Sequence, residues 1–322
     1  MSNSDNKKPL RAKLIFNPTA GKADNSPQQL MDILTHMRDH NIWPEVNILE
    51  PGKSFKPLIK RAFEDGTRLI VASGGDGTID SVAAELAGTK LTLGILPTGT
   101  ANNLAINLRI PRNLDEAVAL LREGRQVKID LGLATSGKTK RYFLELVTLG
   151  LLSDIFPPAD DFRRGEILKA GEVISTFAAS SPSLITLDMD HKKPASLSAY
   201  SVVVANMPYI GRNFRMDRKV SFKDSKLDVF VFTELSKVGL LNYAIGYLSG
   251  EISDETVKHF RVRSISIRTR PQMAVNADGR PLPAKSIKIK VKPAALRVMA
   301  GTDEGHGPRK AEVAELTKVD NG

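Results

Sequence analysis

Residues 12–123 alternate short apolar runs with longer stretches in which apolar residues recur at helical spacing. The apolar runs predict buried parallel strands, because a strand covered on both faces needs apolar residues at nearly every position. The longer stretches predict helices. The predicted strands are 12–16, 43–49, 69–72 and 91–96, and the predicted helices are 26–37, 55–65, 79–87, 101–108 and 114–123. This alternation indicates an α/β domain with a parallel sheet and right-handed crossovers.

From residue 127 onward, many apolar and polar residues alternate with a period of two, which predicts half-buried strands. The predicted strands are 127–134, 142–148, 184–189, 197–205, 227–232, 260–268, 272–276 and 286–299, interrupted by two helical stretches, 166–180 and 237–248. We therefore predict a first domain over residues 10–126 and a mainly antiparallel β-sandwich over residues 127–300. The tail 301–322 is rich in Gly, Glu and Lys and is expected to be disordered.

The length of 322 residues suggests two domains, and the apolar content of 41% is normal for a globular protein. The first residues are polar and lack the apolar region of a signal peptide, and no apolar run reaches the roughly 18 residues that span a bilayer. We therefore expect a cytoplasmic protein without a transmembrane segment. The chain has no cysteine, which excludes disulfides, thiolate zinc sites and cysteine nucleophiles.

The net charge of +10 predicts attraction to anionic partners such as nucleotides, lipid head groups or nucleic acid. The chain has no zinc-finger spacing and no basic region interleaved with aromatic residues, so we expect no nucleic-acid partner. The five histidines, which we expect at the surface rather than in a zinc site, are His36, His40, His191, His259 and His306.

The candidate chemistry starts in residues 74–78 (GGDGT), which follow the predicted strand 69–72 and lead into a predicted helix. The N–H groups and the dipole at a helix N-terminus favour anions, and the glycines allow the main chain to approach a phosphate closely. Asp76 would repel a phosphate unless it holds Mg²⁺ or accepts a hydrogen bond from the reacting hydroxyl. The alternative is that Asp76 merely caps the helix.

Two further polar loops follow predicted strands. Residues 17–21 (NPTAG) follow the first strand, and residues 97–103 (PTGTANN) follow the fourth. Ligands of open parallel sheets bind at the carboxyl ends of the strands, where all three loops would lie together. None of the loops is a Walker A or G-x-G-x-x-G fingerprint, but their convergence predicts a nucleotide site.

The motifs NPTAG, GGDGT and LPTGTANNLA, in this order and spacing, resemble the catalytic domain shared by diacylglycerol kinases, sphingosine and ceramide kinases, and bacterial soluble lipid kinases. The resemblance implies an NAD kinase/diacylglycerol kinase-like α/β domain and a second domain that forms most of the acceptor cleft. It implies transfer of the γ-phosphoryl group of ATP, with Mg²⁺, to a lipid hydroxyl, most readily that of a diacylglycerol-like lipid. It assigns to ATP the residues Asn17, Pro18, Thr19, Ala20, Gly21, Gly74, Gly75, Asp76, Gly77, Thr78, Ile79, Asp80 and Thr100.

Two departures from the family pattern affect charge near its ligands. The family usually has asparagine at the position of Asp80, and it has an Asp-Asp-Gly motif where this chain has Lys223-Asp224-Ser225. The resemblance implies a structural Mg²⁺ held by Asp224 and by the main-chain carbonyls of Ser221 and Lys226, with one acid missing. It also implies that Asp130 helps to organise the cleft and its water network, the alternative being a solvated strand residue.

The third departure lies in residues 276–283 (NADGRPLP). Arg280 stands where the family usually has a glutamate, which is its proposed catalytic base. An arginine stays protonated and cannot act as a base. Three interpretations remain open. Asp278 or Asp76 accepts the proton, Arg280 binds an acidic head group or the transferring phosphoryl, or the chain binds nucleotide without transferring phosphate.

A lipid acceptor requires visits to the membrane surface. Residues 151–180 combine apolar side chains with Arg163 and Arg164, a mixture that could dock on anionic lipid or equally pack on the second domain. We therefore expect transient, peripheral membrane association. The sequence does not determine the oligomeric state and leaves a homodimer open.

Overall fold

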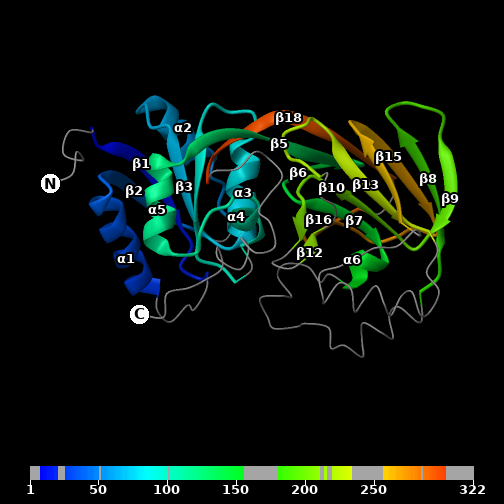
Figure 1. The fold of residues 1–322 in the computed structure, drawn as a ribbon, viewed down its shortest axis with the longest axis horizontal. Helices are drawn as coiled ribbons and strands as arrows, with labels where there is room; N and C mark the ends of the chain where they lie inside the picture. Colours follow the sequence, from blue (N-terminus) through cyan, green and yellow to red (C-terminus); the bar gives the residue numbers. More distant parts are fainter. Residues whose placement is uncertain are drawn as a thin grey trace. The chain divides into compact units, whose positions relative to one another are not determined.

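The structure, a computed structural model, describes residues 8–20, 26–50, 52–100, 102–155, 180–210, 214–215, 220–233, 257–283 and 286–301. The chain divides into two compact units, whose elements Figure 1 colours along the sequence. The first unit contains the residues up to Ile129 and those from Ala295 onward, and the second runs from Asp130 to Ala294. Residues 295–300, which the sequence analysis grouped with the second domain, thus belong to the first unit.

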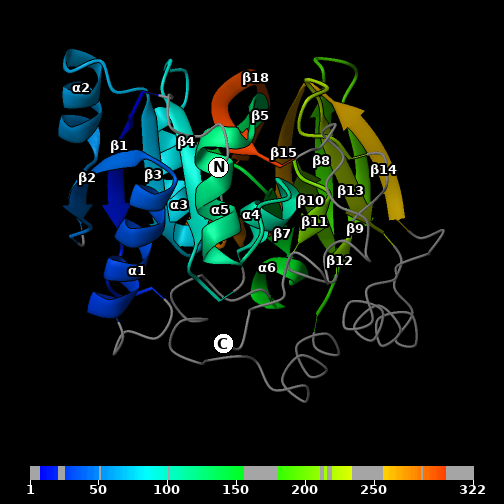
Figure 2. The same ribbon diagram turned by 60° about the vertical axis from the view of Figure 1, so that its left-hand side comes forward.

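The first unit combines parallel strands with helices. The strands are β1 (Leu10–Phe16), β2 (Ile42–Ile48), β3 (Leu69–Gly74), β4 (Thr92–Pro97) and the end of β18 (Ser286–Ala300), and the helices are α1 (Ser26–Asp39), α2 (Lys56–Glu64), α3 (Asp76–Leu86), α4 (Asn103–Asn107) and α5 (Leu114–Glu123). The sheet has the order β2-β1-β3-β4-β18. Helices α1 and α5 lie side by side in Figures 1 and 2, and α3 packs on β3 and β4. The predicted parallel α/β domain is confirmed.

Burial along the central strands explains their composition. Every residue of β3 and β4 is buried, because both strands have a neighbour on each edge and helices against the sheet. The helix predicted over 101–108 is shorter than expected. Asn102 has a left-handed conformation with φ of 57°, so α4 begins only at Asn103.

The second unit consists of two sheets that share one core. One sheet has, in order, β14 (Val257–Val262), β13 (Leu227–Phe232), β10 (Ser201–Ala205), β7 (Leu146–Gly150), β16 (Val275–Ala277) and β17 (Arg280–Leu282). The other sheet contains the first half of β18, followed in order by β15 (Ser264–Arg270), β8 (Ser183–Met189) and β9 (Ala195–Ala199). In this sheet β5 (Arg125–Ser136) pairs with β18 and with β6 (Thr139–Phe143). Short elements are β11 (Tyr209–Ile210), β12 (Phe214–Arg215) and α6 (Leu151–Ile155). The predicted antiparallel β-sandwich is confirmed.

Three of the strands predicted in the second domain are each broken into two. The prediction 142–148 covers β6 and β7, 197–205 covers β9 and β10, and 260–268 covers β14 and β15. In each case the two halves belong to different sheets. Apolar residues continue through the break because both halves bury side chains in the same core, so the apolar pattern alone does not mark the change of sheet.

The breaks leave main-chain groups without ladder partners, and specific acceptors satisfy them. Asp190 Oδ1 accepts the N–H groups of Arg263 and Ser264, both at 2.8 Å, where β14 ends and β15 begins. Asp278 does the same between β6 and β7. Carboxylates, exposed at Asp190 and partly buried at Asp278, therefore help to fix where these strands change sheet.

Other predictions lie outside the described residues. These are the helices over 166–180 and 237–248 and the tail 301–322, apart from Ser180 and Gly301. Among the helices that are described, none combines the length and apolar character needed to cross a membrane.

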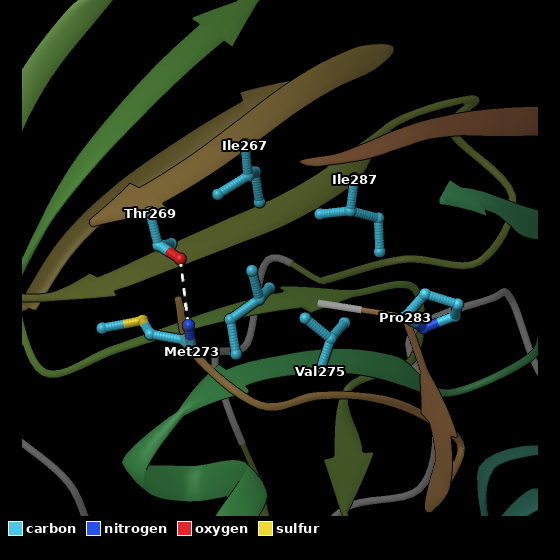
Figure 3. Close-up of a pocket in the computed structure, with 7 residues that line it drawn as sticks. Ile267, Thr269, Met273, Val275, Pro283 and Ile287 are labelled. Atoms are coloured by element: carbon cyan, nitrogen blue, oxygen red, sulfur yellow. Dashed lines mark hydrogen bonds between the residues drawn. The ribbon is translucent and has the colours of Figure 1, made fainter. Parts of the chain in front are cut away.

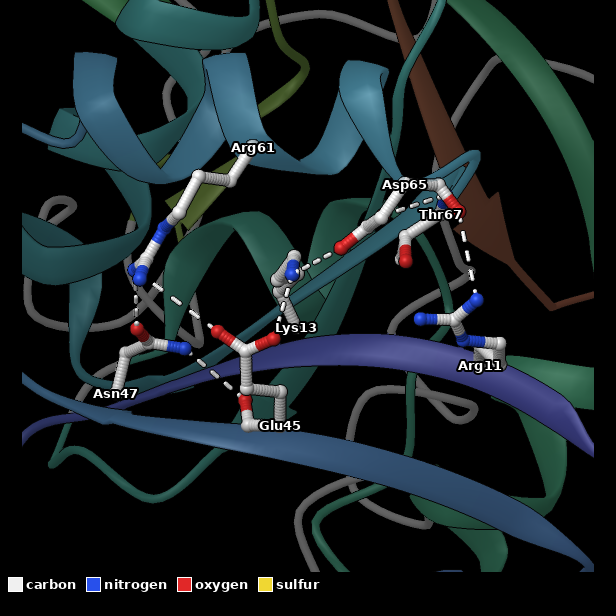
Figure 4. A network of polar contacts seen from close by, with 7 residues as sticks. All are labelled: Arg11, Lys13, Glu45, Asn47, Arg61, Asp65 and Thr67. Carbon is white, nitrogen blue, oxygen red and sulfur yellow. Dashed lines mark hydrogen bonds and ion pairs between the residues drawn. The ribbon is translucent and has the colours of Figure 1, made fainter.

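A buried lysine joins β1 to β2 and to the end of α2 (Figure 4). The Lys13 side chain is 2% exposed, and its Nζ donates to Glu45 at 2.6 Å and to Asp65 at 2.5 Å. Burial alone would lower the pKa of Lys13, but the two hydrogen bonds outweigh it and raise that pKa. The same hydrogen bond with Lys13 lowers the pKa of Asp65 well below its usual range.

This network predicts part of the acid sensitivity of the first unit. A carboxyl group whose pKa is lower in the folded state stabilises the fold above its unfolded pKa, and that contribution disappears as the pH falls. We expect the free energy of unfolding of Lys13→Met, measured with urea, to fall less between pH 5 and pH 2.5 than that of the native chain. Lys60→Met, which removes an exposed pair with Glu64 at 3.7 Å, is the control and should follow the native curve. Parallel losses in native protein and Lys13→Met would contradict the expectation.

Candidate functional site

The three loops singled out in the sequence meet at the carboxyl ends of β1, β3 and β4. Asn17 follows β1, and its Nδ2 donates a hydrogen bond to Thr78 Oγ1 at 2.7 Å, on the first turn of α3. The main-chain N–H of Asn17 donates to the carbonyl of Ser73 in β3 at 3.0 Å. Thr98, after β4, lies with its hydroxyl 3.4 Å from that of Ser73. Strand order therefore brings together loops that are about 25–80 residues apart in the sequence.

Two of these loops cross in direct main-chain contact at Gly75 and Gly99. A Cβ atom on Gly99 would lie 2.3 Å from the Cα atom of Gly75, which no real side chain tolerates, whereas a Cβ on Gly75 would lie at an ordinary 3.4 Å from Gly99. Gly74 is constrained as well, because its Cβ would lie 2.7 Å from the side chain of Thr78. The small size of these glycines is therefore needed for the close contact between the loops, apart from any role in binding a ligand.

Asp76 also joins the two loops. It is the first residue of α3, and its Oδ2 accepts the main-chain N–H of Asn102 at 3.0 Å, at the N-terminus of α4. The N-cap residue of α3 is Gly75, and Asp76 lies in the first turn, so its contact with the third loop comes in addition to any stabilisation of its own helix. Burial raises the pKa of Asp76, although N–H groups of residues 102–104 oppose this shift. Its Oδ1 is buried and has no hydrogen-bond partner within the described part of the chain.

Asn102 holds the third loop in shape, a role that the sequence analysis did not assign. Its fully buried side chain accepts the N–H of Gly99 at 3.1 Å and donates to the carbonyls of Pro97 and Gly99 at 3.1 and 2.8 Å. The signal was present in the sequence, because asparagine tolerates the left-handed conformation and bonds to nearby main chain.

The other predicted nucleotide residues differ in what they offer to a ligand. Thr19 and Thr100 are exposed, and Pro18, Ala20 and Gly77 are partly exposed. Ile79 is fully buried in the core, so its side chain is not available for a ligand, and Asp80 is buried as well. Gly21 lies outside the described residues.

In the second unit, Asp278 and Gly279 form the two-residue turn between β16 and β17. Both have positive φ, 44° and 67°, as a type I′ turn requires, and Ala277 pairs with Arg280 across it. The Asp-Gly pair is a strong hairpin signal, but the sequence analysis used it only as a family motif and ended the strand at 276. Arg280, expected in the catalytic motif, is therefore the first residue of β17.

The Asp278 carboxylate accepts three consecutive main-chain N–H groups at the break between β6 and β7. Oδ2 accepts that of Leu144 at 2.6 Å, and Oδ1 accepts those of Glu145 and Leu146 at 3.1 and 2.9 Å. Burial raises the pKa of Asp278 to about 6, although these N–H groups and the Arg280 guanidinium oppose the shift. Asp278 is thus both a structural acceptor and a carboxylate that titrates near neutral pH.

Asn206 connects this turn to Asp130, and the sequence analysis missed it. Its Nδ2 donates to the carbonyls of Leu144 and Asp130 at 2.8 and 2.9 Å. The Asp130 carboxylate accepts the N–H of Ser225 at 2.6 Å and that of Ala294 at 2.7 Å. Asp130 is 3% exposed, so the alternative of a solvated strand residue is wrong. Burial raises the pKa of Asp130, against the effect of the two N–H groups.

In the loop expected to hold a structural Mg²⁺, the acidic side chain is already paired with an arginine of β14. Asp224 Oδ1 accepts the N–H of Lys226 at 3.0 Å, and Oδ2 is paired with the Arg261 guanidinium. Arg261 Nε also lies 3.5 Å from Asp228, which is buried and bonded to His259 at 2.7 Å. Ser221 is buried, and its hydroxyl accepts the N–H of Lys223 at 3.3 Å. With one acid missing and the other neutralised, these residues do not fit a bound Mg²⁺.

Two histidines contact the same carboxylate. His36, in the last turn of α1, and His40, directly after the end of that helix, both contact Asp115 Oδ1 on α5, at 3.0 and 2.9 Å. Because both histidines contact the same oxygen of Asp115, we interpret these contacts as hydrogen bonds between side chains. Across the described ranges, no group of three or more His, Cys, Asp or Glu residues is arranged to hold a metal ion.

A small apolar cavity lies between the two sheets of the second unit (Figure 3). Leu149 and Val275 line it from one sheet, and Ile267 and Ile287 line it from the other. Thr269 contributes the polar contact drawn in Figure 3, in which its hydroxyl accepts the N–H of Met273 at 3.0 Å. The cavity shows that this sandwich core has incompletely filled apolar space.

Two family models match the chain in succession. The diacylglycerol kinase catalytic domain matches residues 11–134, which include all three loops of the first unit. The YegS C-terminal NAD kinase β-sandwich-like domain matches residues 161–300, which include Asp224, Asp278 and Arg280. The motifs quoted from the sequence therefore lie within the two matched domains.

Relatives and solved structures extend over most of the chain. A probable lipid kinase YegS-like from Klebsiella pneumoniae is 29% identical over 301 residues, 88% of this chain and 94% of the relative. A diacylglycerol kinase from Staphylococcus carnosus is 25% identical over 298 residues, covering 87% and 92%. The crystal structure of a diacylglycerol kinase from Bacillus anthracis superposes with a TM-score of 0.70 at 22% identity, covering 92% and 98%, and shows the same fold.

The glycine crossing predicts unequal effects of two similar substitutions. Gly99→Ala places a methyl group against the main chain of Gly75 and should lower stability by roughly 1–3 kcal/mol. Gly75→Ala has room and should cost less than about 1 kcal/mol. Thermal and urea unfolding of both variants test this, and equal effects would contradict the asymmetry of the crossing.

The Asp224–Arg261 pair predicts a second unit whose stability does not depend on a divalent cation. The melting temperature of the nucleotide-free protein should be the same in EDTA and in millimolar Mg²⁺. Arg261→Met leaves Asp224 and buried Asp228 without the guanidinium and should cost roughly 1–3 kcal/mol. Arg268→Met, at an exposed arginine of β15, is the control. A melting temperature that rises with Mg²⁺ in native protein but not in Asp224→Asn would establish a metal site instead.

Proposed function

Because this chain belongs to the family of the diacylglycerol kinase catalytic domain, we propose that it is an ATP-dependent lipid kinase. It transfers the γ-phosphoryl group to a hydroxyl group of a lipid with a diacylglycerol-like backbone. The observation that carries the proposal is the meeting of three loops from the matched catalytic domain at the carboxyl ends of β1, β3 and β4. That edge of a parallel sheet is where such folds bind their ligands.

The nucleotide is bound by the first unit. Loop 17–21, loop 74–80 and Thr100 supply the contacts, mostly through main-chain atoms, because the glycines leave no side chains in the way. Gly75→Ala, which the fold tolerates, should therefore weaken ATP binding. The net charge of +10 favours the anionic nucleotide and an anionic membrane surface.

Asp76 is the residue that we assign to Mg²⁺ or to the reacting hydroxyl. Its Oδ1 is a buried acceptor without a hydrogen-bond partner in the described ranges, which fits a missing cation or donor. When bound, Mg²⁺ supplies neutralisation of phosphate charge. Asp76 would hold the ion, and its bond to Asn102 would keep the carboxylate oriented.

Asp278 is the candidate acceptor of the hydroxyl proton. A pKa of about 6 keeps most of the carboxylate ionised at neutral pH and near the value at which a general base is efficient. Three of its roughly four acceptor directions are used by main-chain N–H groups, which leaves one for a substrate hydroxyl. Asp130 supports this turn through Asn206 and has no direct part in transfer.

The lipid is acquired at a membrane surface. We propose a cytoplasmic protein that associates with the bilayer transiently, with the acceptor held by the second unit. The basic net charge supports this, because it favours an anionic membrane surface. A homodimer is compatible with the proposal, and nucleic acid has no role in it.

A second candidate function follows from Arg280. Arg280 lies near Asp278, at the position of the glutamate that is the proposed catalytic base of the family. The chain could therefore bind nucleotide without transferring phosphate, or it could phosphorylate an acceptor that is not a lipid. Both alternatives keep the nucleotide site and remove the lipid product, which separates them from the first proposal.

The test measures transfer of labelled γ-phosphate from ATP and Mg²⁺ to diacylglycerol, monoacylglycerol, ceramide, sphingosine and phosphatidylglycerol in mixed micelles. We expect a labelled lipid from the native chain and a loss on the order of a hundredfold in Asp76→Asn. Asp39→Asn, at an exposed aspartate of α1, is the matched control. Undiminished transfer in a folded Asp76→Asn would refute the role of Asp76. If native protein binds ATP but labels no lipid, the second candidate takes over.

A further inference from the structure

The loop 221–226 holds Asp130 by two hydrogen bonds. The N–H of Asp130 donates to the carbonyl of Phe222 at 2.8 Å, and Asp130 Oδ2 accepts the N–H of Ser225 at 2.6 Å. Asp130 is buried, so water competes little for these hydrogen bonds. The conformation of the loop therefore sets the position of Asp130.

Asn206 joins Asp130 to the segment that contacts the Asp278 turn. Its Nδ2 donates to the carbonyls of Asp130 and Leu144 at 2.9 and 2.8 Å, and its main-chain N–H donates to the carbonyl of Glu145 at 2.8 Å. The N–H groups of Leu144 and Glu145 in turn donate to the Asp278 carboxylate at 2.6 and 3.1 Å. Because Asn206, Leu144 and Glu145 are all buried, a change in the loop reaches Asp278 through packed, hydrogen-bonded residues.

The loop adopts a conformation that a serine does not favour by itself. Ser225 has a φ of 60°, in the left-handed region, where the family has glycine. Contacts around Ser225 therefore have to hold it in this conformation. One of them is on the preceding residue, where Asp224 Oδ2 is paired with the Arg261 guanidinium. Among the ion pairs of the described residues, Arg261 is the only cation paired with Asp224.

Arg261 also ties the loop to the neighbouring strands. It belongs to β14, and its Nε lies 3.5 Å from Asp228 Oδ1 on β13, the strand that follows the loop. One guanidinium thus lies between two carboxylates, which suits its forked arrangement of donors. The guanidinium stays protonated at neutral pH, and its charge does not depend on the concentration of a free ion.

We propose that Arg261 is a positioning residue for phosphoryl transfer. Its guanidinium holds the loop 221–226, and the loop acts through Asp130 and Asn206 on the N–H groups that orient the Asp278 carboxylate. The inference rests on the proposed function, in which the hydroxyl oxygen bonds to the γ-phosphorus, the bond from that phosphorus to the β–γ bridging oxygen breaks, ADP leaves and Asp278 takes up the proton. Arg261 replaces a structural cation in this arrangement, so the divalent ion that accompanies ATP is sufficient for activity.

The first experiment compares Arg261→Met with Arg261→Lys and with two controls. Ile267→Val removes one methylene group from the buried core of the same unit, and Arg268→Met removes an exposed arginine of β15. Transfer of labelled phosphate to diacylglycerol in mixed micelles gives kcat and KM. Hydrogen exchange of the amides of residues 144–146 and 225 reports on their hydrogen bonds without reference to activity.

We expect Arg261→Met to lower kcat roughly tenfold with the KM of ATP unchanged, because the change affects the orientation of the proton acceptor and not the nucleotide. Exchange at residues 144–146 should accelerate more than in Ile267→Val, whereas both controls keep the native kcat. Arg261→Lys retains the charge but not the fork and should give intermediate values.

Asn206→Ala tests the route from the loop to the turn. We expect the kcat of Asn206→Ala/Arg261→Met to equal that of Asn206→Ala within about twofold, because the loss of Asn206 already separates Asp278 from the loop.

An exchange of charges tests whether the guanidinium replaces a cation. Lys223→Asp/Arg261→Met restores the second acid of the family motif and removes the internal cation. We expect millimolar Mg²⁺ to raise the melting temperature of this nucleotide-free variant above its value in EDTA, and to leave the native value unchanged. The kcat of the variant should likewise rise once free Mg²⁺ is present beyond that bound to ATP.

Three results would overturn the inference and leave the kinase proposal intact. They are a kcat of Arg261→Met within about twofold of native, exchange at residues 144–146 equal to that of Ile267→Val, and independent losses in the double variant with Asn206→Ala. A Lys223→Asp/Arg261→Met protein that does not respond to Mg²⁺ would overturn the replacement of a cation by Arg261. Absence of labelled lipid from native protein would instead reject the proposed function, and hydrogen exchange would still decide whether Arg261 orders residues 144–146.

Discussion

The second unit depends on one carboxylate that accepts three consecutive main-chain N–H groups. Asp278 ends the ladder of β6 and starts that of β7, which lets the chain pass from one sheet of the sandwich to the other. The same residue forms the left-handed turn before Arg280. Its geometry therefore supports both the strand change and the hairpin. A carboxylate is suited to this because it accepts several hydrogen bonds and donates none when ionised.

The first unit solves a similar problem with glycine and asparagine. Its three loops must come together at one edge of the sheet, and their main chains touch where Gly99 meets Gly75. Asp76 and Asn102 then satisfy the polar groups that this contact leaves, and Asn17 joins the first loop to the second through Thr78. Loop-to-loop bonds of this kind order the loops in advance, which would lower the cost of binding the proposed nucleotide.

The departures from the family pattern are changes of charge rather than of fold. The Arg261 guanidinium neutralises Asp224, the acid that would otherwise bind a metal cation. Asp224 also accepts the N–H of Lys226, so contacts within the protein hold the loop 221–226 in shape. Arg280 places a positively charged side chain beside Asp278, where the family has an acid. Both departures therefore change the charge that the loop presents, since a fold places side chains and the side chains select what binds.

The sequence by itself determined the elements of the first unit and the edge of the sheet at which its three loops meet, because buried parallel strands and their glycine-rich loops have strong local patterns. It also determined the class of the second unit, since alternation follows from one buried face. It did not reveal where strands change sheet, because apolar residues continue through each break. Only the tertiary structure decided that Asn206 joins Asp130 to Leu144, whose N–H donates to Asp278, and that Arg141 reaches the carbonyl of Pro281. It alone showed Arg261 neutralising Asp224, because such contacts between distant segments leave no periodic trace in the chain.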